Sequence, residues 1–330
     1  MQKHERLTAA EISNIWIHYI NETMALCVNK YMLNITKDPE IQNIYKVAVK
    51  MGENHIAILK EFFHQENFPI PKGFSESDVN LDAPPLYTDK YCLFYIMSMT
   101  MQGLQQYGLA ISLCRRQDMR KFYYQCNQDT IDLYEMTMDA FVSKGTYEVP
   151  PFYATPKRIE FINDLSYVTD VFGKRRKMNA VESGNIFYHL EKSKIMKAFI
   201  LGGQQVCKDK EVLNFLGKLI DALNDHIGTF TNYLINENLT TGNTFDTEVT
   251  HSAISPFSER LFMYHAGIFI ASAISYYSMA AITNMRADIT FNCEKSIARD
   301  LVAYGKFGKL MIKKGWIEKP PFADDRSQSS

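Results

Sequence analysis

Four histidines offer the clearest chemistry in this sequence, because they recur as two pairs at a fixed interval. His18 and His55 in the first half correspond to His189 and His226 in the second (189 − 18 = 171; 226 − 55 = 171). If each pair lies on two antiparallel helices, its imidazoles reach the same height in a helical bundle, where histidines bind Fe, Mn or Zn. The alternative is a pair of neutral core histidines, each hydrogen-bonded to a neighbour such as Asn14. We favour core packing and expect no cofactor, with a divalent metal as the alternative.

A metal site would also need carboxylates from the first or fourth helix of its bundle. The nearest candidates are Glu11, Glu22, Asp129 and Asp132 in the first half, and Glu182 and Asp300 in the second. The two halves differ, because Ser193 stands in the place of Glu22 and Arg299 in the place of Asp129. Any metal site is therefore expected to be stronger in the first half.

The signatures of the common enzyme classes are missing. A ferritin-like di-iron site takes Glu from two helices and Glu-x-x-His from the other two, but residues 91–114 and 261–285 contain no Asp or Glu. The sequence has no Gly-x-Gly-x-x-Gly, no P-loop, no Gly-x-Ser-x-Gly and no His-Glu-x-x-His. Gly202-Gly203 lies within a predicted helix and indicates close helix packing. We expect that the protein is not a di-iron oxidase. Whether it is an enzyme of another class stays open, and we favour a protein without catalytic activity.

The elements that position the histidines are written twice. The block from Lys144 to Phe152 returns at Lys314 to Phe322, 170 residues later (314 − 144 = 170). Thr8 with Glu11, and Asn179 with Glu182, have the form of capping boxes that start a helix. The pattern predicts helices at 9–35, 40–67, 90–114 and 118–143, a long connection at 68–89, and their copies.

Loops in the order short, long, short are typical of a ferritin-like up-down four-helix bundle with one long crossover. The predicted fold is therefore all-α, a tandem duplication of such a bundle. We expect a first bundle at residues 1–152, a linker at 153–177 and a second bundle at 178–330, packed about a pseudo-twofold axis.

Composition excludes several partners. The chain has 330 residues, with 36 basic and 37 acidic side chains and a net charge of −1, which gives no general field for nucleic acid. The run from Lys174 to Lys177 is interpreted as a solvated part of the linker, with an anionic partner as the alternative. Six cysteines lack metal-site or redox spacing and predict buried thiols in a reducing compartment. With no secretory signal at the start of the sequence, we expect a cytoplasmic protein.

One apolar stretch, Leu261 to Thr283, is long enough to span a bilayer. Its counterpart in the first half carries Gln102, Gln105 and Gln106, which a lipid-facing helix tolerates badly. We therefore expect no membrane span. These two stretches should instead form the most buried helices of the protein, each facing its own bundle and either the other half or a second subunit.

Several segments together resemble a family of uncharacterised proteins from spore-forming Gram-positive bacteria. They are Leu7 to Asn14, Glu66 to Phe74, Gly173 to Arg176, the two Lys-Gly…Pro-Pro-Phe blocks and Asp325-Arg326. The resemblance implies tandem ferritin-like domains, and some relatives are described as spore-coat-like. It implies a structural or interaction protein of a sporulating cell, spore-associated, whose partners are further copies or other coat proteins. The alternative is a metal-binding ferritin-like protein or an oxidoreductase with a non-standard site.

Overall fold

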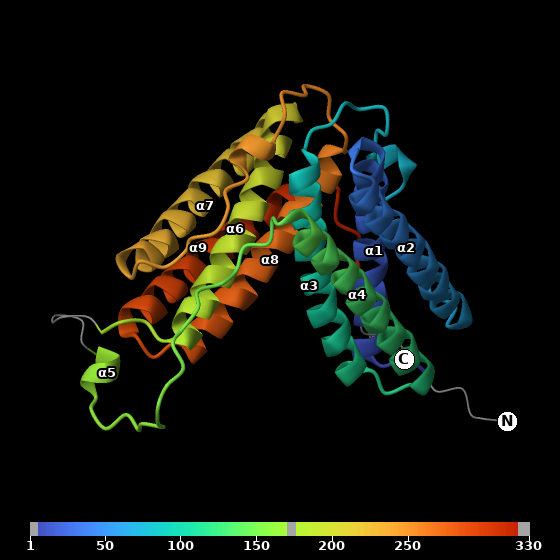
Figure 1. Ribbon diagram of the computed structural model, residues 1–330. Helices are drawn as coiled ribbons and strands as arrows, with labels where there is room; N and C mark the ends of the chain where they lie inside the picture. Colours follow the sequence, from blue (N-terminus) through green and yellow to red (C-terminus); the bar gives the residue numbers. More distant parts are fainter. Residues whose placement is uncertain (1–5, 170–175, 323–330) are drawn as a thin grey trace.

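The computed structural model describes residues 6–169 and 176–322, and it is all-helical there, with no β-strand (Figure 1). The first half contains α1 (Ala9–Ile35), α2 (Pro39–Gln65), α3 (Asp89–Leu113) and α4 (Gln117–Lys144). The second contains α6 (Ala180–Val206), α7 (Lys210–Asn236), α8 (Glu259–Thr283) and α9 (Ala287–Lys313). The short α5 (Ser166–Thr169) and the 3-10 turns η1 (Glu76–Asp78) and η2 (Asp246–Glu248) lie in the connections. The all-α class and the duplication are confirmed.

The helices start where local hydrogen bonding favours it. Thr8 accepts from the backbone N–H of Glu11, whose carboxylate accepts from the backbone of Thr8, and Asn179 with Glu182 repeats this capping box. Asp38 caps α2 ahead of Pro39, a residue whose fixed φ suits the first turn. Both predicted first helices, 9–35 and 180–206, have these bounds in the structure.

Residues 66–88 run the length of the first bundle. The carboxylate of Asp89, at the start of α3, accepts from the backbone N–H of Asp38 at the start of α2 (2.8 Å). At the other end of the bundle, Glu66 after α2 pairs with Arg116 before α4. Helices α2 and α3 are therefore parallel, and the connection between them is a crossover. The second half repeats both contacts, through Glu259 with Asp209 and Glu237 with Arg286.

The two crossover connections pair with each other about a pseudo-twofold axis. Val79 bridges to Phe257 and Val249 bridges to Tyr87. Because Val249 is the copy of Val79 (249 − 79 = 170) and Phe257 the copy of Tyr87 (257 − 87 = 170), each bridge is the symmetry partner of the other. The connections meet at the apex of the inverted V that the two bundles form (Figure 1).

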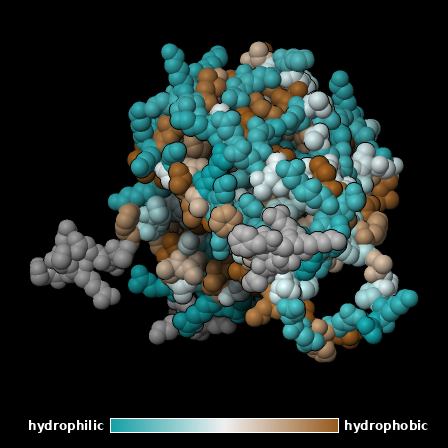
Figure 2. Space-filling view, turned by 90° about the vertical axis from the view of Figure 1, so that its left-hand side faces the viewer, coloured by the Kyte–Doolittle hydropathy of each residue, from teal (hydrophilic) through white to brown (hydrophobic). Residues whose placement is uncertain are grey.

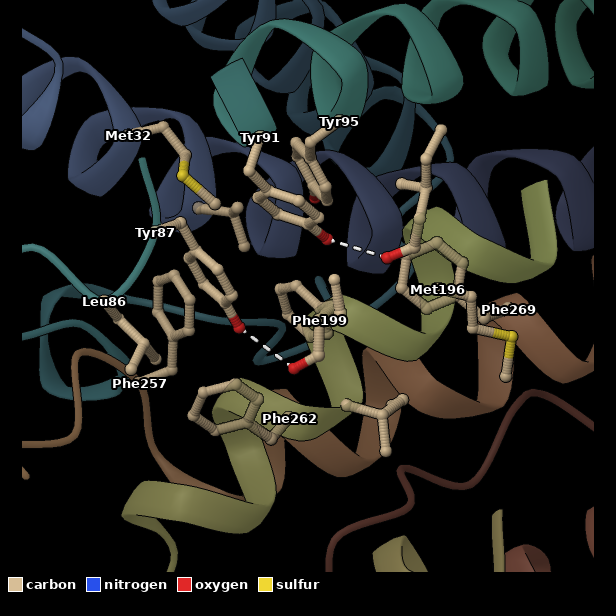
Figure 3. Close-up of a cluster of buried hydrophobic side chains, with 14 of the residues drawn as sticks. Met32, Leu86, Tyr87, Tyr91, Tyr95, Met196, Phe199, Phe257, Phe262 and Phe269 are labelled. Carbon is tan, nitrogen blue, oxygen red and sulfur yellow. Dashed lines mark hydrogen bonds between the residues drawn. The ribbon is translucent and has the colours of Figure 1, made fainter. Parts of the chain in front are cut away.

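A cluster of aromatic side chains joins the halves below this crossing (Figure 3). The hydroxyls of Tyr87 and Tyr91 donate to the backbone carbonyls of Phe199 (2.9 Å) and Ile195 (3.0 Å). Gly202 lets α6 approach, because a Cβ there would collide with the ring of Tyr87. The close packing expected at Gly202-Gly203 is thus present.

The segments that follow α4 and α9 cross to the opposite half. Glu318 accepts from the backbone N–H groups of Lys72 (2.6 Å) and Gly73 (2.9 Å). Glu148, its copy (318 − 148 = 170), accepts from the backbone N–H of Asn243. The predicted linker follows the first of these segments, and its residues 170–175 lie outside the described chain.

Helices α3 and α8 are not the most buried elements, contrary to expectation. Their N-terminal halves are buried at the junction, but Leu109 and Met279 near their C-termini are exposed. The bundles diverge toward these ends, so each helix there loses the cover of the other half (Figure 1). Buried residues extend along all of α6. By length and composition α8 could cross a membrane, and 39% of its most apolar window is buried.

Candidate functional site

His55 is the centre of a buried network in the first half. Its Nδ1 lies 3.2 Å from Oε1 of Glu22 on α1, and its Nε2 lies 3.2 Å from Oδ2 of Asp129 on α4. The hydroxyl of Tyr107 on α3 also donates to Glu22. All four helices of the bundle therefore contribute one side chain to the network, which binds the imidazole between two carboxylates.

His18 lies beside this network without joining it. The rings of His18 and His55 both contact Tyr107, at centroid separations of 5.3 and 5.9 Å. Nδ1 of His18 hydrogen-bonds to the hydroxyl of Tyr123 on α4 (3.2 Å). The backbone carbonyl of Asn14, the neighbour suggested by helical spacing, also accepts a hydrogen bond from His18, while the side chain of Asn14 donates to the thiol of Cys114 (3.7 Å).

The charges of the network follow from its hydrogen bonds. Burial alone would lower the pKa of His55, but the carboxylates of Glu22 and Asp129 outweigh it and raise that pKa above its usual value. Burial would raise the pKa of Glu22, whereas its bonds to His55 and Tyr107 lower it. Burial lowers the pKa of His18 to about 4, so that this imidazole is neutral at pH 7.

The second half has kept the histidines and lost the network. Ser193 replaces the acceptor Glu22 and bonds to Tyr277 (3.2 Å). Within the described chain neither ring nitrogen of His189 has a hydrogen-bond partner, and burial lowers its pKa to about 4. Nε2 of His226 is 3.9 Å from Oδ1 of Asp300, whose pKa burial raises to about 7. His226 also has its pKa lowered to about 4, mainly by burial.

The donor set does not fit a di-iron centre. Among the residues the structure describes, no three His, Cys, Asp or Glu side chains are grouped to hold a metal ion. Glu22, Asp129 and Asp300 lie beside the histidines, but the three other carboxylates proposed as ligands have other partners. Glu11 and Glu182 cap helices, and Asp132 accepts from Gln128 on an exposed face. His55 belongs to a hydrogen-bonded network and His18 bonds to Tyr123 beside it. Core packing of the four histidines, with metal binding as the alternative, stays a prediction.

A cavity adjoins the network in the first half. Its volume is about 120 Å³, and Glu22, His18 and Tyr107 contribute to its wall. The corresponding space beside His189 is about 20 Å³, little more than the roughly 10–15 Å³ that one water needs. Sequence analysis missed this cavity, although Gly52 facing it has the much larger Leu223 as its copy (223 − 52 = 171).

Comparison with known families finds one family model twice in the chain. The model of the family described as "Protein of unknown function (DUF3231)" matches residues 1–159 and again residues 166–328. The chain belongs to this family. Each half matches the family model, so the duplication found in the sequence is a duplication of a family unit. The description of the family names no reaction.

Comparison with curated proteins gives no significant match. A solved structure from Bacillus halodurans, a "putative spore coat protein", matches with 19% sequence identity and a TM-score of 0.41. The match covers 46% of this chain and 98% of the other.

Proposed function

We propose that this protein is a structural, non-catalytic interaction protein of a sporulating cell, made in the cytoplasm and associated with the spore coat. The sequence resemblance supports the cellular setting. The observation that carries the interaction role is a set of exposed apolar side chains that occupies equivalent positions in both halves. Val142 on α4 and its copy Ile312 on α9 are each 71% exposed (312 − 142 = 170).

A second pair of positions lies on the same faces. Ile131 and its copy Leu301 are also exposed. Ile131 precedes Val142 on α4, and Leu301 precedes Ile312 on α9, by 11 residues (142 − 131 = 11; 312 − 301 = 11). Eleven residues make about three helical turns, so each pair shares one face of its helix. Hydrophobic side chains reach the surface of the second half at several places among hydrophilic ones (Figure 2).

Two equivalent apolar faces on one chain allow it to contact two neighbours. When such contacts do not close into a ring, they build an extended assembly, which is what a coat layer requires. The partners proposed are further copies of this chain and other coat proteins. A near-neutral net charge of −1 favours such association over binding to nucleic acid.

The test combines location and assembly. The tagged protein should be found with purified spore coats and be nearly absent from vegetative membranes. In solution its apparent mass by light scattering should rise with concentration. The double variant Val142→Lys, Ile312→Lys should stay at the mass of one chain, while Glu61→Lys on the exposed face of α2, away from both apolar faces, should assemble normally. A wild type that is monomeric at all concentrations and absent from spores would contradict the proposal.

The rival function is that of a metal-binding protein or metal-dependent oxidoreductase. The contacts of His55 with Glu22 and Asp129 favour it, but the two carboxylates contact opposite nitrogens of one ring, and among the described residues no three such side chains could hold a metal ion. Elemental analysis of protein purified without chelator separates the two. We expect less than one metal ion per chain, and two iron or manganese ions per chain would establish the rival.

A further inference from the structure

We propose that the cavity of the first half is a binding site for a small organic cation, a short-chain primary ammonium whose charged group contacts Glu22. This inference concerns a cavity of the first bundle that α8 also lines through His265 and Ile268, and it is independent of the proposed assembly. It depends on the shape of the cavity, the charge beside it and one buried ring nitrogen that has no hydrogen-bond partner among the described residues.

The shape of the cavity comes from small residues on α2. Gly52 and Ala48 face the space, and their copies in the second half are Leu223 and Leu219 (219 − 48 = 171). A Cβ added to Gly52 would make ordinary van der Waals contact with Oε2 of Glu22 (3.7 Å) and the side chain of Leu26 (3.9 Å), so a side chain fits at this position without a collision. In the second half, leucines at these two positions occupy the space that is empty in the first half. Its cavity is about 20 Å³ against about 120 Å³ in the first half.

The charge beside the cavity is negative. Glu22 and Asp129 share one imidazole, His55, so even a protonated His55 leaves one negative charge in excess. Of the described side chains that line the cavity, none is Lys or Arg. Asp129 is 34% exposed and does not line the cavity, so Glu22, 8% exposed, is the carboxylate that a bound cation would contact. Anions would be repelled.

The hydrogen-bonding groups match an ammonium. The side chain of His18 is 5% exposed and lines the cavity, and its Nε2 has no partner among the described residues. When His18 Nδ1–H donates to Tyr123, Nε2 is left as an acceptor. An ammonium group carries three donors and no acceptor, which suits the carboxylate of Glu22 and the free nitrogen of His18.

The rest of the wall favours an organic cation over a metal ion. Met51, Ile96, Met99 and Leu133 line the cavity. These side chains would cover an alkyl chain, and burying it stabilises the complex by about 0.8 kcal/mol for each CH₂ group. A transition-metal ion would need several N, O or S ligands around it, and these four side chains supply only the thioether sulfurs of Met51 and Met99.

The test uses n-butylammonium as the probe, with n-butanol and butyrate as neutral and anionic molecules of the same length. Calorimetric titration at pH 7.5 should show saturable binding of n-butylammonium to the full chain and at least tenfold weaker binding of the other two. Glu22→Gln should weaken the binding at least tenfold, and Gly52→Leu should abolish it. His189→Gln, the matched change in the second half, should leave it unchanged.

Near-UV circular dichroism establishes that each variant is folded, and Ala48→Leu replaces Gly52→Leu if that variant is not. The proposal is overturned if n-butylammonium does not bind, if n-butanol binds equally well, or if the cavity-filling variant binds normally. It is also overturned if Mn²⁺ or Zn²⁺ displaces n-butylammonium and its own binding depends on Glu22, because the site is then a metal site.

Discussion

The imidazole of His55 is tied to two carboxylates, and this distinguishes it from the other histidines of the four. We expect His55→Gln to lower the free energy of unfolding by about 1–3 kcal/mol at pH 5.5, the usual scale for a buried hydrogen-bonded group. Because its folded pKa is raised, the stabilisation by His55 is complete below its unfolded pKa of about 6.5 and declines as the pH rises through the folded value. Urea unfolding at pH 5.5 and pH 9 measures this decline.

His226 provides the control with the opposite sign. Its pKa is lowered to about 4, so the unfolded chain binds its proton first as the pH falls from about 6.5 to 4. On acidification the stability of His226→Gln should therefore rise relative to that of the wild type, whereas the stability of His55→Gln should fall relative to it. If both variants changed in the same direction, the charged state assigned to His55 would be wrong.

Asp300 is a buried acid that the second half stabilises poorly. Burial raises its pKa to about 7, and the copy in the first half is Thr130, whose hydroxyl donates to the carbonyl of Cys126 (2.7 Å). The folded chain thus holds a proton that the unfolded chain releases above about pH 4, and stability falls as the pH rises toward 7. Asp300→Thr should be more stable than the wild type at pH 8, with a smaller gain at pH 5. Thermal unfolding at both pH values tests it, and an equal gain would contradict it.

Sequence spacing could predict which histidines recur, but not what each one bonds to. Helical periodicity names neighbours on the same helix, and it proposed Asn14 for His18. The backbone of Asn14 does bond to His18, but the other partner, Tyr123, lies on α4 and reaches His18 only through the packing of the bundle. The cavity was missed for the same reason, because one Gly in a helix becomes a cavity only when the facing side chains fail to fill it.

At the scale of the elements, two glutamates do more than cap their helices. Glu11 is fully buried, and its carboxylate accepts from the backbone N–H of Arg115 (2.8 Å) and Arg116 (2.7 Å) in the α3–α4 turn as well as from Thr8. Glu182 repeats this with the α8–α9 turn at Arg286 (3.1 Å). The sequence showed the capping box, while the contact with a turn about 100 residues away needed the fold.

We therefore expect Glu11→Gln to lower the free energy of unfolding by about 1–3 kcal/mol at pH 7, since a neutral amide is a weaker acceptor for several N–H groups. The pKa of Glu11 is lowered, with burial opposed by those backbone hydrogen bonds, so the difference should shrink as the pH falls through that lowered value. Denaturant unfolding at pH 7 and pH 3 measures it. Glu61→Gln, on the exposed face of α2, should change stability by less than about 0.5 kcal/mol.

At the scale of the whole molecule, the duplication could be predicted because the same residues recur in both halves of the sequence. For the junction, the sequence predicted a pseudo-twofold packing but not the contacts between the halves. Tyr87 and Tyr91 look like ordinary core residues in the chain. In the structure they donate across the junction to backbone carbonyls of α6, and each C-terminal segment packs on the opposite half. The two family units therefore share one core, and they should unfold together.

Gly202 tests that shared core. A Cβ at this position would collide with the Tyr87 ring from the other half, whereas a Cβ at Gly228 on α7 would have no atom within 4 Å. Gly202→Ala should lower the free energy of unfolding by about 1–3 kcal/mol through overpacking. Gly228→Ala should raise it by about 0.5–1 kcal/mol, the usual gain of alanine over glycine in a helix. Calorimetry should show one transition for both variants, shifted down in the first and up in the second. If Gly202→Ala instead split the transition in two, the halves would be independently stable domains, and the junction would contribute little to either.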